Sequence, residues 1–369
     1  MAKKTPKATA RKNAPAKTPA RRAPHAKVPS AGTPVTLEEA QALALATAPR
    51  LAARRAATPQ APAQDGPSPA TVGKEREKLR KRQEDDREAN RREYTAVMRI
   101  MKERGARAPA GKGARRGTVA ATRFTPLQVV AEGDSWFKYP VPLFGGGIIR
   151  RLQKRLGVPI LNLAAAGDEV RFMLGVEQRK RLSETLTEGC PAGGPWDVLL
   201  FSGGGNDIVD NPMALWIREW NSAVPPKRHL DDVRFAAALT LVRAGYEDLI
   251  AMRDKHSPNT RLVFHGYDYA IPDGRGVCKY GPWLKPTFDL HGFPNQATAQ
   301  EVVNEMLTRF AFMLQQLSSD SVTYVSTQGT LHAQPSAWHN ELHPEKKGFD
   351  TFADMFHAHL RQIFPGRVL

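Results

Sequence analysis

The chain has 369 residues, of which 41% are apolar, so it can bury the core of one large domain or of two smaller ones. Its net charge of +17 comes from the first third, because residues 1–123 hold 29 Lys and Arg against 11 Asp and Glu, and residues 124–369 hold 25 against 26. No apolar run reaches the length of about 18 residues that a membrane span needs, and the N-terminus lacks the apolar segment of a secretory signal. We therefore expect a cytoplasmic protein without a transmembrane span.

The chain contains only two cysteines, Cys190 and Cys278. They are too few for a disulfide framework and lack the spacing of metal ligands. We interpret both as incidental thiols, the alternative being a single disulfide between them in an oxidising compartment.

Residues 1–73 are expected to form a disordered basic tail with one short helix. Residues 1–34 are rich in Lys, Arg, Ala, Pro and Thr and contain no acidic residue. This composition resembles the tails of linker-histone-like proteins, which implies non-specific binding to nucleic acid or to another anionic surface. A solvated tail with no single partner is the alternative. Within residues 36–57, an apolar pattern that begins at Leu37 predicts a short helix capped by Thr36.

Residues 74–104 predict a charged, solvent-exposed helix. Glu77 and Lys81 have the i,i+4 spacing that supports such a helix. No large apolar residue occurs between Leu79 and Tyr94, so no coiled-coil seam runs along it. Only the last turns carry apolar side chains that could dock on a domain, namely Val97, Met98, Ile100 and Met101.

A basic linker, residues 105–123, precedes a different pattern in residues 124–369. Short apolar strands there alternate with amphipathic helices, which is typical of βα units and a parallel sheet. We predict a single three-layer α/β/α sandwich around a five-stranded parallel sheet, an α/β fold of the flavodoxin-like kind. The predicted strands are 127–131, 159–163, 198–201, 262–266 and 322–326, and the predicted helices are 148–156, 170–182, 231–254, 299–317 and one that begins near Glu345.

Three of these strands end in polar or glycine-rich loops, residues 133–135, 165–168 and 202–207. The carboxyl ends of parallel strands meet at one edge of the sheet, where α/β proteins bind their ligands. We therefore expect the three loops to form a common site.

The residues in these loops fit the needs of acyl transfer, which requires a nucleophile, a base and fixed donors for an oxyanion. Ser135 offers a hydroxyl group and its own backbone N–H. Gly167 has no side chain to block the approach of a substrate to its N–H, and Asn206 adds a side-chain donor. The base is expected late in the chain, where His343 precedes the last predicted helix.

This order of motifs resembles that of the SGNH hydrolases, also called GDSL esterases and lipases. The serine motif corresponds to residues 133–135, the glycine motif to 162–167, the asparagine motif to 205–207 and the histidine motif to 340–343. The resemblance covers about residues 125–365 and leaves the basic third outside. It implies a serine esterase that hydrolyses a small-molecule or lipid ester through an acyl-enzyme, with Ser135 as nucleophile, His343 as base, Ser135, Gly167 and Asn206 as oxyanion donors, and no metal or organic cofactor.

The chain departs from the family at Asn340, where the family usually has the aspartate that orients the histidine. An amide carries no negative charge, and if its NH2 group faced the ring it would select the wrong tautomer. If the amide oxygen faced the ring, it could accept the ring N–H. Glu341 and a main-chain carbonyl are the other candidates for this role. We predict an active hydrolase in which Asn340 or a carbonyl orients His343.

Two further interpretations remain at this stage. The function could lie in the basic tail, as a nucleic-acid-binding protein on a hydrolase fold that Asn340 has inactivated, or the tail could draw a lipolytic enzyme to anionic membranes. Residues 275–293 contain several aromatic residues and are long enough to form a lid or a pocket wall. His265, at the end of a predicted strand, is interpreted as a structural histidine.

Overall fold

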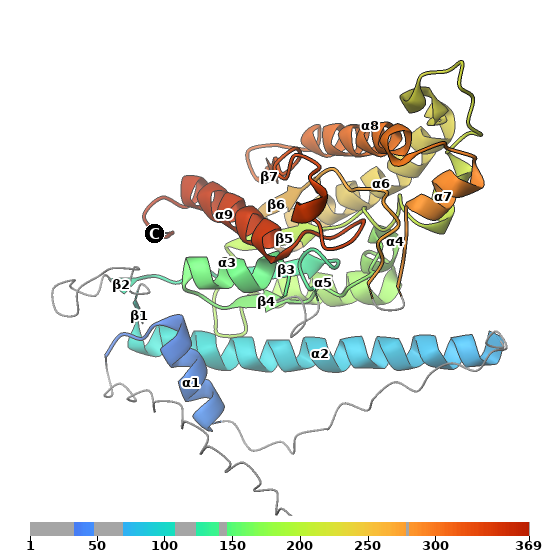
Figure 1. Cartoon of the computed structure of the whole chain (residues 1–369). Helices are drawn as coiled ribbons and strands as arrows, with labels where there is room; N and C mark the ends of the chain where they lie inside the picture. The colour runs from blue at the N-terminus through green and yellow to red at the C-terminus, as the bar shows by residue number, and fades with distance from the viewer. Residues whose placement is uncertain (1–32, 48–68, 108–122, 140–145, 278–279, 369) are drawn as a thin grey trace, which may run out of the picture.

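The computed structural model describes residues 33–47, 69–107, 123–139, 146–277 and 280–368 (Figure 1). Nearly all of the predicted tail of residues 1–34 lies outside these ranges, as do Cys278 and most of the linker 105–123. Cys190 is a buried free cysteine. In the parts of the chain that are described, no helix is both long enough and apolar enough to cross a membrane.

A parallel sheet of five strands lies at the centre of residues 124–368 (Figure 1). The strand order is β4-β3-β5-β6-β7, and every neighbouring pair is parallel. Each residue of β3 and β5 is buried, as expected for central strands covered on both faces. The bounds of the strands are Val129–Gly133 for β3, Ile160–Asn162 for β4, Val198–Ser202 for β5, Arg261–His265 for β6 and Val322–Val325 for β7.

Helices cover both faces of this sheet. The connection from β3 to β4 runs in one direction along the sheet, and the connections from β4 onward to β7 run in the other. Because such connections are right-handed, α3 lies on one face of the sheet and the helices between β4 and β7 lie on the other. Accordingly α3 packs against α9, whereas α6 packs against α4, α5 and α8. The structure thus confirms the predicted three-layer α/β/α sandwich. The helices are α3 (Ile148–Leu156), α4 (Val170–Met173), α5 (Val176–Glu188), α6 (Asp232–His256), α8 (Gln296–Gln315) and α9 (Lys346–Ile363).

The helix predicted at 170–182 is in fact two helices, α4 and α5, separated at Gly175, which precedes α5 in an extended conformation. The connections also contain a short helix and three single turns of 3-10 helix. These are α7 (Lys285–Leu290), η1 (Asn211–Leu215), η2 (Pro226–His229) and η3 (Pro335–Ala337).

Two helices precede the sandwich, α1 (Leu37–Thr47) and α2 (Pro69–Arg104), and they pack against each other (Figure 1). Thr36 and Glu39 form a capping box at the start of α1: Thr36 N donates to Glu39 Oε2 at 2.8 Å, and Glu39 N donates to Thr36 Oγ1 at 3.3 Å. The helix predicted within 36–57 is described only over Leu37–Thr47. After α2, the two-residue strand β1 (Ala106–Arg107) pairs with β2 (Arg123–Phe124).

The expectation that α2 is solvent-exposed before its last turns is wrong at Arg87, although most described side chains of residues 77–86 are exposed. The helix contacts β4, the edge strand of the sheet, and Arg87 in its middle is only 5% exposed. Ion pairs at i,i+4 spacing, such as that of Glu88 with Arg92, lie on the exposed side of the helix and carry no information about the opposite side. The inner side of its second half packs on the sandwich through Tyr94, Val97, Met98 and Met101.

Candidate active site

The turn after β3 places Ser135 at the carboxyl edge of the sheet. Gly133 pairs with Ser202 of the neighbouring strand β5, and a Cβ atom at Gly133 would lie 2.6 Å from the main-chain oxygen of Ser202. A larger residue would push the two strand ends apart. Glycine therefore permits the close approach from which the chain turns toward Ser135.

Asp134 holds this turn from inside. Its Oδ1 accepts hydrogen bonds from Trp136 N at 3.0 Å and from Ser202 Oγ at 2.8 Å, and its Oδ2 accepts one from Tyr267 Oη at 2.5 Å. Burial raises the pKa of Asp134 to about 6, and these hydrogen bonds oppose that rise by favouring the ionised form.

His265, at the end of β6, belongs to this support and not to the reacting groups. Its Nδ1 accepts a hydrogen bond from Tyr267 N at 3.2 Å, so the ring proton lies on Nε2, 3.0 Å from Ser202 Oγ. Burial lowers the pKa of His265 to about 3, so the ring is neutral. The structural interpretation of His265 is confirmed.

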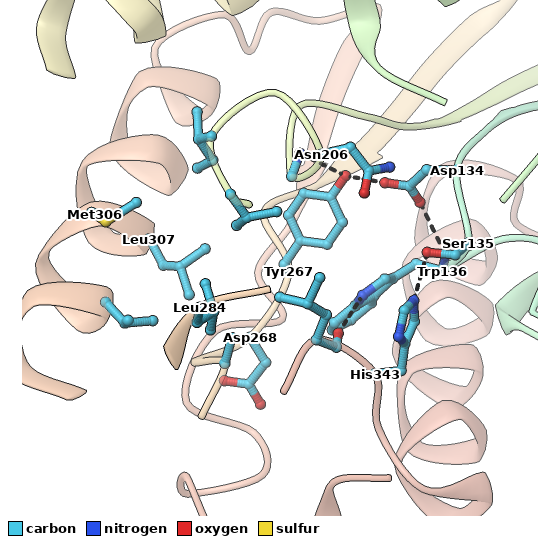
Figure 2. A pocket seen from close by; sticks show the side chains of 16 residues that line it. Asp134, Ser135, Trp136, Asn206, Tyr267, Asp268, Leu284, Met306, Leu307 and His343 are labelled. Carbon is cyan, nitrogen blue, oxygen red and sulfur yellow. Dashed lines mark hydrogen bonds between the residues drawn. The ribbon is translucent and has the colours of Figure 1, made fainter. Parts of the chain in front are cut away.

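Ser135 and His343, 208 positions apart in the chain, meet at a distance of 2.6 Å between Oγ and Nε2. Figure 2 shows the imidazole directed at the serine hydroxyl. A second contact joins the loop that carries His343 to the turn that carries Ser135, because Trp136 Nε1 donates to the main-chain oxygen of Leu342 at 3.1 Å. The two groups that the sequence pairs as nucleophile and base are therefore in hydrogen-bond contact.

The side chain of Asn340 has its oxygen toward the ring of His343. This oxygen accepts hydrogen bonds from Leu342 N at 3.0 Å and from His343 N at 2.9 Å, and only an acceptor fits these two donors. The amide nitrogen donates instead to Tyr139 Oη at 2.9 Å. His343 Nδ1, 3.0 Å from the Asn340 oxygen, must therefore carry the ring proton. Nε2 is then free to accept the proton of Ser135.

The imidazole of His343 is neutral. Burial, with a smaller contribution from charge repulsion by His339, lowers its pKa to about 3. The neutral amide of Asn340 supplies no negative charge that would raise the pKa again. The ring of Tyr139 stacks on the imidazole, with 4.3 Å between the ring centroids and 23° between the ring planes.

Glu341, another candidate for orienting His343, binds backbone groups and not the imidazole. Its position close to the histidine in sequence did not indicate this. The buried carboxylate accepts hydrogen bonds from four backbone N–H groups of the insertion 275–293 and the residue before it. Oε1 accepts from Gly274 at 2.9 Å and Lys285 at 2.9 Å, and Oε2 accepts from Trp283 at 2.5 Å and Leu284 at 2.7 Å. Glu341 therefore anchors the insertion to the histidine loop.

The backbone N–H groups of Ser135 and Gly167, the two groups expected to bind an oxyanion, have no acceptor among the described residues. Gly167 has a φ of +84°, which favours glycine, and a Cβ atom there would meet nothing within 4 Å, so its surroundings are open. Asn206 Nδ2 donates to the main-chain oxygen of Asp168 at 2.9 Å and keeps a second proton for another acceptor.

One cavity joins Ser135, Asn206 and His343, whereas Gly167 is not part of its wall (Figure 2). The carboxylate of Asp268 also borders it but is occupied by three backbone donors, Tyr269 N, Gly329 N and Leu331 N, at 2.6–2.7 Å. The rest of the wall is mainly apolar and includes Ile208, Val209, Leu284, Val303, Met306 and Leu307. In the described ranges, no group of three or more His, Cys, Asp or Glu residues is arranged to hold a metal ion.

No family model and no curated protein sequence matches this chain. Several solved structures are similar to it in fold. A lipase from a goat rumen metagenome is 19% identical with a TM-score of 0.42, and the match covers 66% of this chain and 100% of the lipase. A carbohydrate esterase family 3 protein from Talaromyces cellulolyticus is 12% identical with a TM-score of 0.38 over 64% and 97% of the two chains. A protein from Slackia heliotrinireducens, proposed to be an SGNH hydrolase, is 12% identical with a TM-score of 0.36 over 63% and 97%.

Proposed function

We propose that this protein is a serine esterase that hydrolyses carboxylic esters through an acyl-enzyme on Ser135. The observation that carries the proposal is the 2.6 Å contact between Ser135 Oγ and His343 Nε2, in a tautomer that Asn340 fixes. The unpaired N–H groups of Ser135 and Gly167 support it. A hydroxyl, a neutral base and fixed donors are the parts that acyl transfer requires.

The geometry fits a two-step reaction. His343 takes the proton of Ser135 as the hydroxyl attacks the ester carbonyl, and the N–H groups of Ser135 and Gly167 and the amide of Asn206 stabilise the oxyanion. The imidazolium then gives its proton to the leaving alcohol. In the second step water, deprotonated by the same imidazole, attacks the acyl carbonyl, and the imidazolium returns the proton to Ser135 Oγ as the acid leaves.

The proposal can be tested on the full chain with p-nitrophenyl butyrate as substrate and a fluorophosphonate as a probe of the nucleophile. We expect hydrolysis that follows saturation kinetics, and loss of activity as one phosphonyl group attaches to Ser135, located by mass spectrometry. A protein that neither hydrolyses the ester nor reacts with the probe would contradict the proposal.

The cavity beside the dyad supports an apolar acyl group as the part of the substrate that the protein recognises. Ser135 and His343 lie at one side of this cavity, and Leu284, Met306 and Leu307 lie at the other (Figure 2). Because Asp268 already accepts three backbone hydrogen bonds, it offers little to a polar substrate group. An alkyl or aryl chain would displace water from these walls at a gain of about 0.8 kcal/mol per methylene.

Replacing Leu307 by tryptophan is expected to shorten the acyl chains that the enzyme accepts. The larger ring would fill the far end of the cavity, so kcat/KM for p-nitrophenyl octanoate should fall relative to that for the acetate by about 10-fold or more. Leu241→Trp is the matched control, because Leu241 is 70% exposed on α6. An unchanged octanoate-to-acetate ratio in Leu307→Trp would show that the acyl chain binds elsewhere.

Replacing Asn340 by aspartate is expected to raise kcat about 10-fold. A carboxylate there can accept the same hydrogen bonds from Leu342 N, His343 N and His343 Nδ1, and it adds the negative charge that stabilises an imidazolium in the transition state. In serine-protease triads, exchanging the aspartate for asparagine changes kcat by roughly 10⁴-fold, because the amide there selects the wrong tautomer of the histidine. The expected gain is smaller in this protein, because Asn340 already selects the tautomer with its proton on Nδ1.

The pH profile of Asn340→Asp provides a second readout. Only the neutral ring accepts the serine proton, so activity is lost as the pH falls through the pKa of His343. Since the new charge raises that pKa from about 3, the acid limb of the variant should lie at higher pH. Asp134, whose pKa is raised to about 6, is present in both proteins. Any effect of its titration on activity is therefore the same in both and cancels when one kcat/KM profile is divided by the other. A ratio that does not change between about pH 4 and 9 would contradict the assignment of His343 as base.

Binding of nucleic acid or another anionic surface by residues 1–34 stays a prediction from their charge. It is compatible with an esterase, because the basic residues precede the part of the chain that forms the site.

A further inference from the structure

Arg87, in the middle of α2, reaches into the sandwich and binds the loop that carries Gly167. Its Nε donates to the main-chain oxygen of Leu163 at 2.7 Å, and its Nη2 donates to Asp168 Oδ2 at 3.0 Å. The guanidinium group thus holds both ends of the segment 163–168. Arginine suits this task because its planar fork can bind two acceptors in a fixed relative position.

A second residue of α2 extends this contact along the edge of the sheet. Asn90 Nδ2 donates to the main-chain oxygen of Asn162, the last residue of β4, at 2.9 Å. Side chains of α2 therefore bind two consecutive carbonyl groups, those of Asn162 and Leu163, where the edge strand ends and the loop begins. An edge strand has unpaired backbone groups on its outer side, and α2 supplies donors for them.

Arg87 also supplies positive charge where the sheet buries two carboxylates. Glu132 in β3 is 4% exposed and Asp168 is 8% exposed. Burial raises the pKa of both groups, and the positive charge of Arg87 lowers the pKa of both. Without Arg87, both carboxyl groups would lose a positive charge that favours their ionised forms, and the loop would lose the partner that binds the side chain of Asp168.

The contact continues to Asn206. The side chain of Asp168 accepts a hydrogen bond from Arg87, and the main-chain oxygen of the same residue accepts one from Asn206 Nδ2 at 2.9 Å. Arg87 is thus bonded to both ends of the segment that contains Gly167 and, through Asp168, to Asn206. Two of the three oxyanion donors depend on a loop that α2 holds in place.

We propose that Arg87 is a positioning residue of the oxyanion hole, and that α2, although it lies outside the sandwich, is required for full catalytic activity. This inference rests on the proposed esterase function. Oxyanion donors act only if they are fixed about 3 Å from the developing charge, and a displacement of about 1 Å can lower the rate about 10²-fold. Arg87 contributes to catalysis by restricting the positions of the Gly167 N–H and the Asn206 amide.

The test is Arg87→Gln in the full chain, assayed with p-nitrophenyl butyrate. We expect kcat to fall about 10–100-fold with little change in KM, since the displaced donors bind the transition state more strongly than the ester. The matched control is Arg91→Gln. Arg91 lies one turn further along α2 and docks the helix on α5, with Nη2 2.8 Å from Thr185 Oγ1 and Nη1 3.7 Å from Glu188. It does not touch the loop 163–168, so its kcat should stay near that of the wild type.

Arg87→Lys covers the case in which Arg87→Gln does not fold. Lysine keeps the charge near Glu132 and Asp168 but cannot reproduce the fork that binds Leu163 and Asp168 together. We expect near-normal thermal stability with a kcat between those of the wild type and Arg87→Gln. Affinity for butylboronic acid, whose tetrahedral adduct with Ser135 places an oxygen in the oxyanion hole, should fall in parallel with kcat/KM.

The outcomes separate the two proposals. A wild-type chain that does not hydrolyse the ester refutes the esterase function and with it the role of Arg87. An active wild type whose Arg87 variants keep the kcat and boronic acid affinity of Arg91→Gln, and differ only in melting temperature, refutes the positioning role alone.

Discussion

Replacing either Ser135 or His343 by alanine is expected to lower kcat for p-nitrophenyl butyrate by about 10⁴–10⁶-fold. The first change removes the attacking oxygen, and the second removes the base 2.6 Å from it. Because the two groups act as a unit, the double variant should be no slower than the slower single variant. Steady-state kinetics of the three variants, with protein from which traces of wild type have been removed, would measure this.

The controls for these variants are a surface serine and the fold itself. Ser319→Ala changes an exposed serine just before β7, at the amino edge of the parallel sheet and opposite to the edge that holds Ser135, and should keep full activity. Ser135→Ala removes only a hydroxyl, so circular dichroism and the melting temperature should show an intact protein. A Ser135→Ala variant that keeps more than about a hundredth of the activity would exclude Ser135 as the nucleophile.

Replacing Asn206 by alanine is expected to lower kcat by about 10²–10³-fold with a small change in KM, the usual effect of losing one oxyanion donor. Asn206 lines the cavity that contains Ser135, and its amide donates one of its two protons to the main-chain oxygen of Asp168, which leaves the other for a substrate. Asn206→Asp should be slower still, because it brings a negative charge toward the site of the developing oxyanion. Kinetics and boronic acid affinity for both variants check this.

Asn221→Ala serves as the control for Asn206, since Asn221 lies in the loop between η1 and η2 and its side chain accepts only a local hydrogen bond from Ala223 N at 2.9 Å. It should leave kcat unchanged. If Asn206→Ala raised KM and left kcat intact, Asn206 would bind the ground state of the ester and would not be an oxyanion donor.

The layout of the sandwich could be predicted because its signals are local. The apolar run at Val198–Phe201 is followed by glycines, which marks a buried strand and the loop at its end, and the structure places β5 at Val198–Ser202. The predicted helix 148–156 coincides with α3. The helix predicted at 170–182 is two helices in the structure, with Gly175 between them. The apolar periodicity continues across this glycine, and periodicity alone does not show whether a glycine interrupts a helix.

The orientation of Asn340 could not be predicted, because it depends on contacts that no local pattern contains. The amide is set by the backbone N–H groups of Leu342 and His343 and by the hydroxyl of Tyr139, which is 201 positions away in the chain. The sequence shows that Asn340 stands three positions before His343, but not which atom of its amide faces the ring. That orientation depends on where the Leu342 N–H, the His343 N–H and the Tyr139 hydroxyl lie in space.

Arg87 and Glu341 show the same limit for charged residues. Both occur in polar stretches and resemble solvated side chains, yet both are buried and bind backbone groups of distant loops. Burial of a charge is costly unless partners compensate for it, and these partners lie 56 or more positions away. A charged residue with such partners looks the same in sequence as one that faces water.

Glu341 has a consequence for how this protein can diversify. Its carboxylate binds the backbone on both sides of residues 275–282, at Gly274 and at Trp283–Lys285, and so closes the base of that segment. Arg275 belongs to the anchor, because its Nη1 donates to the main-chain oxygen of Trp338 at 2.7 Å and its own main-chain oxygen accepts from Glu341 N at 3.1 Å. Substitutions or changes of length within residues 276–282 should leave Leu284 and the histidine loop where they are. New substrate ranges could therefore be acquired in this segment, by natural variation or by grafting, without rebuilding the residues next to Ser135.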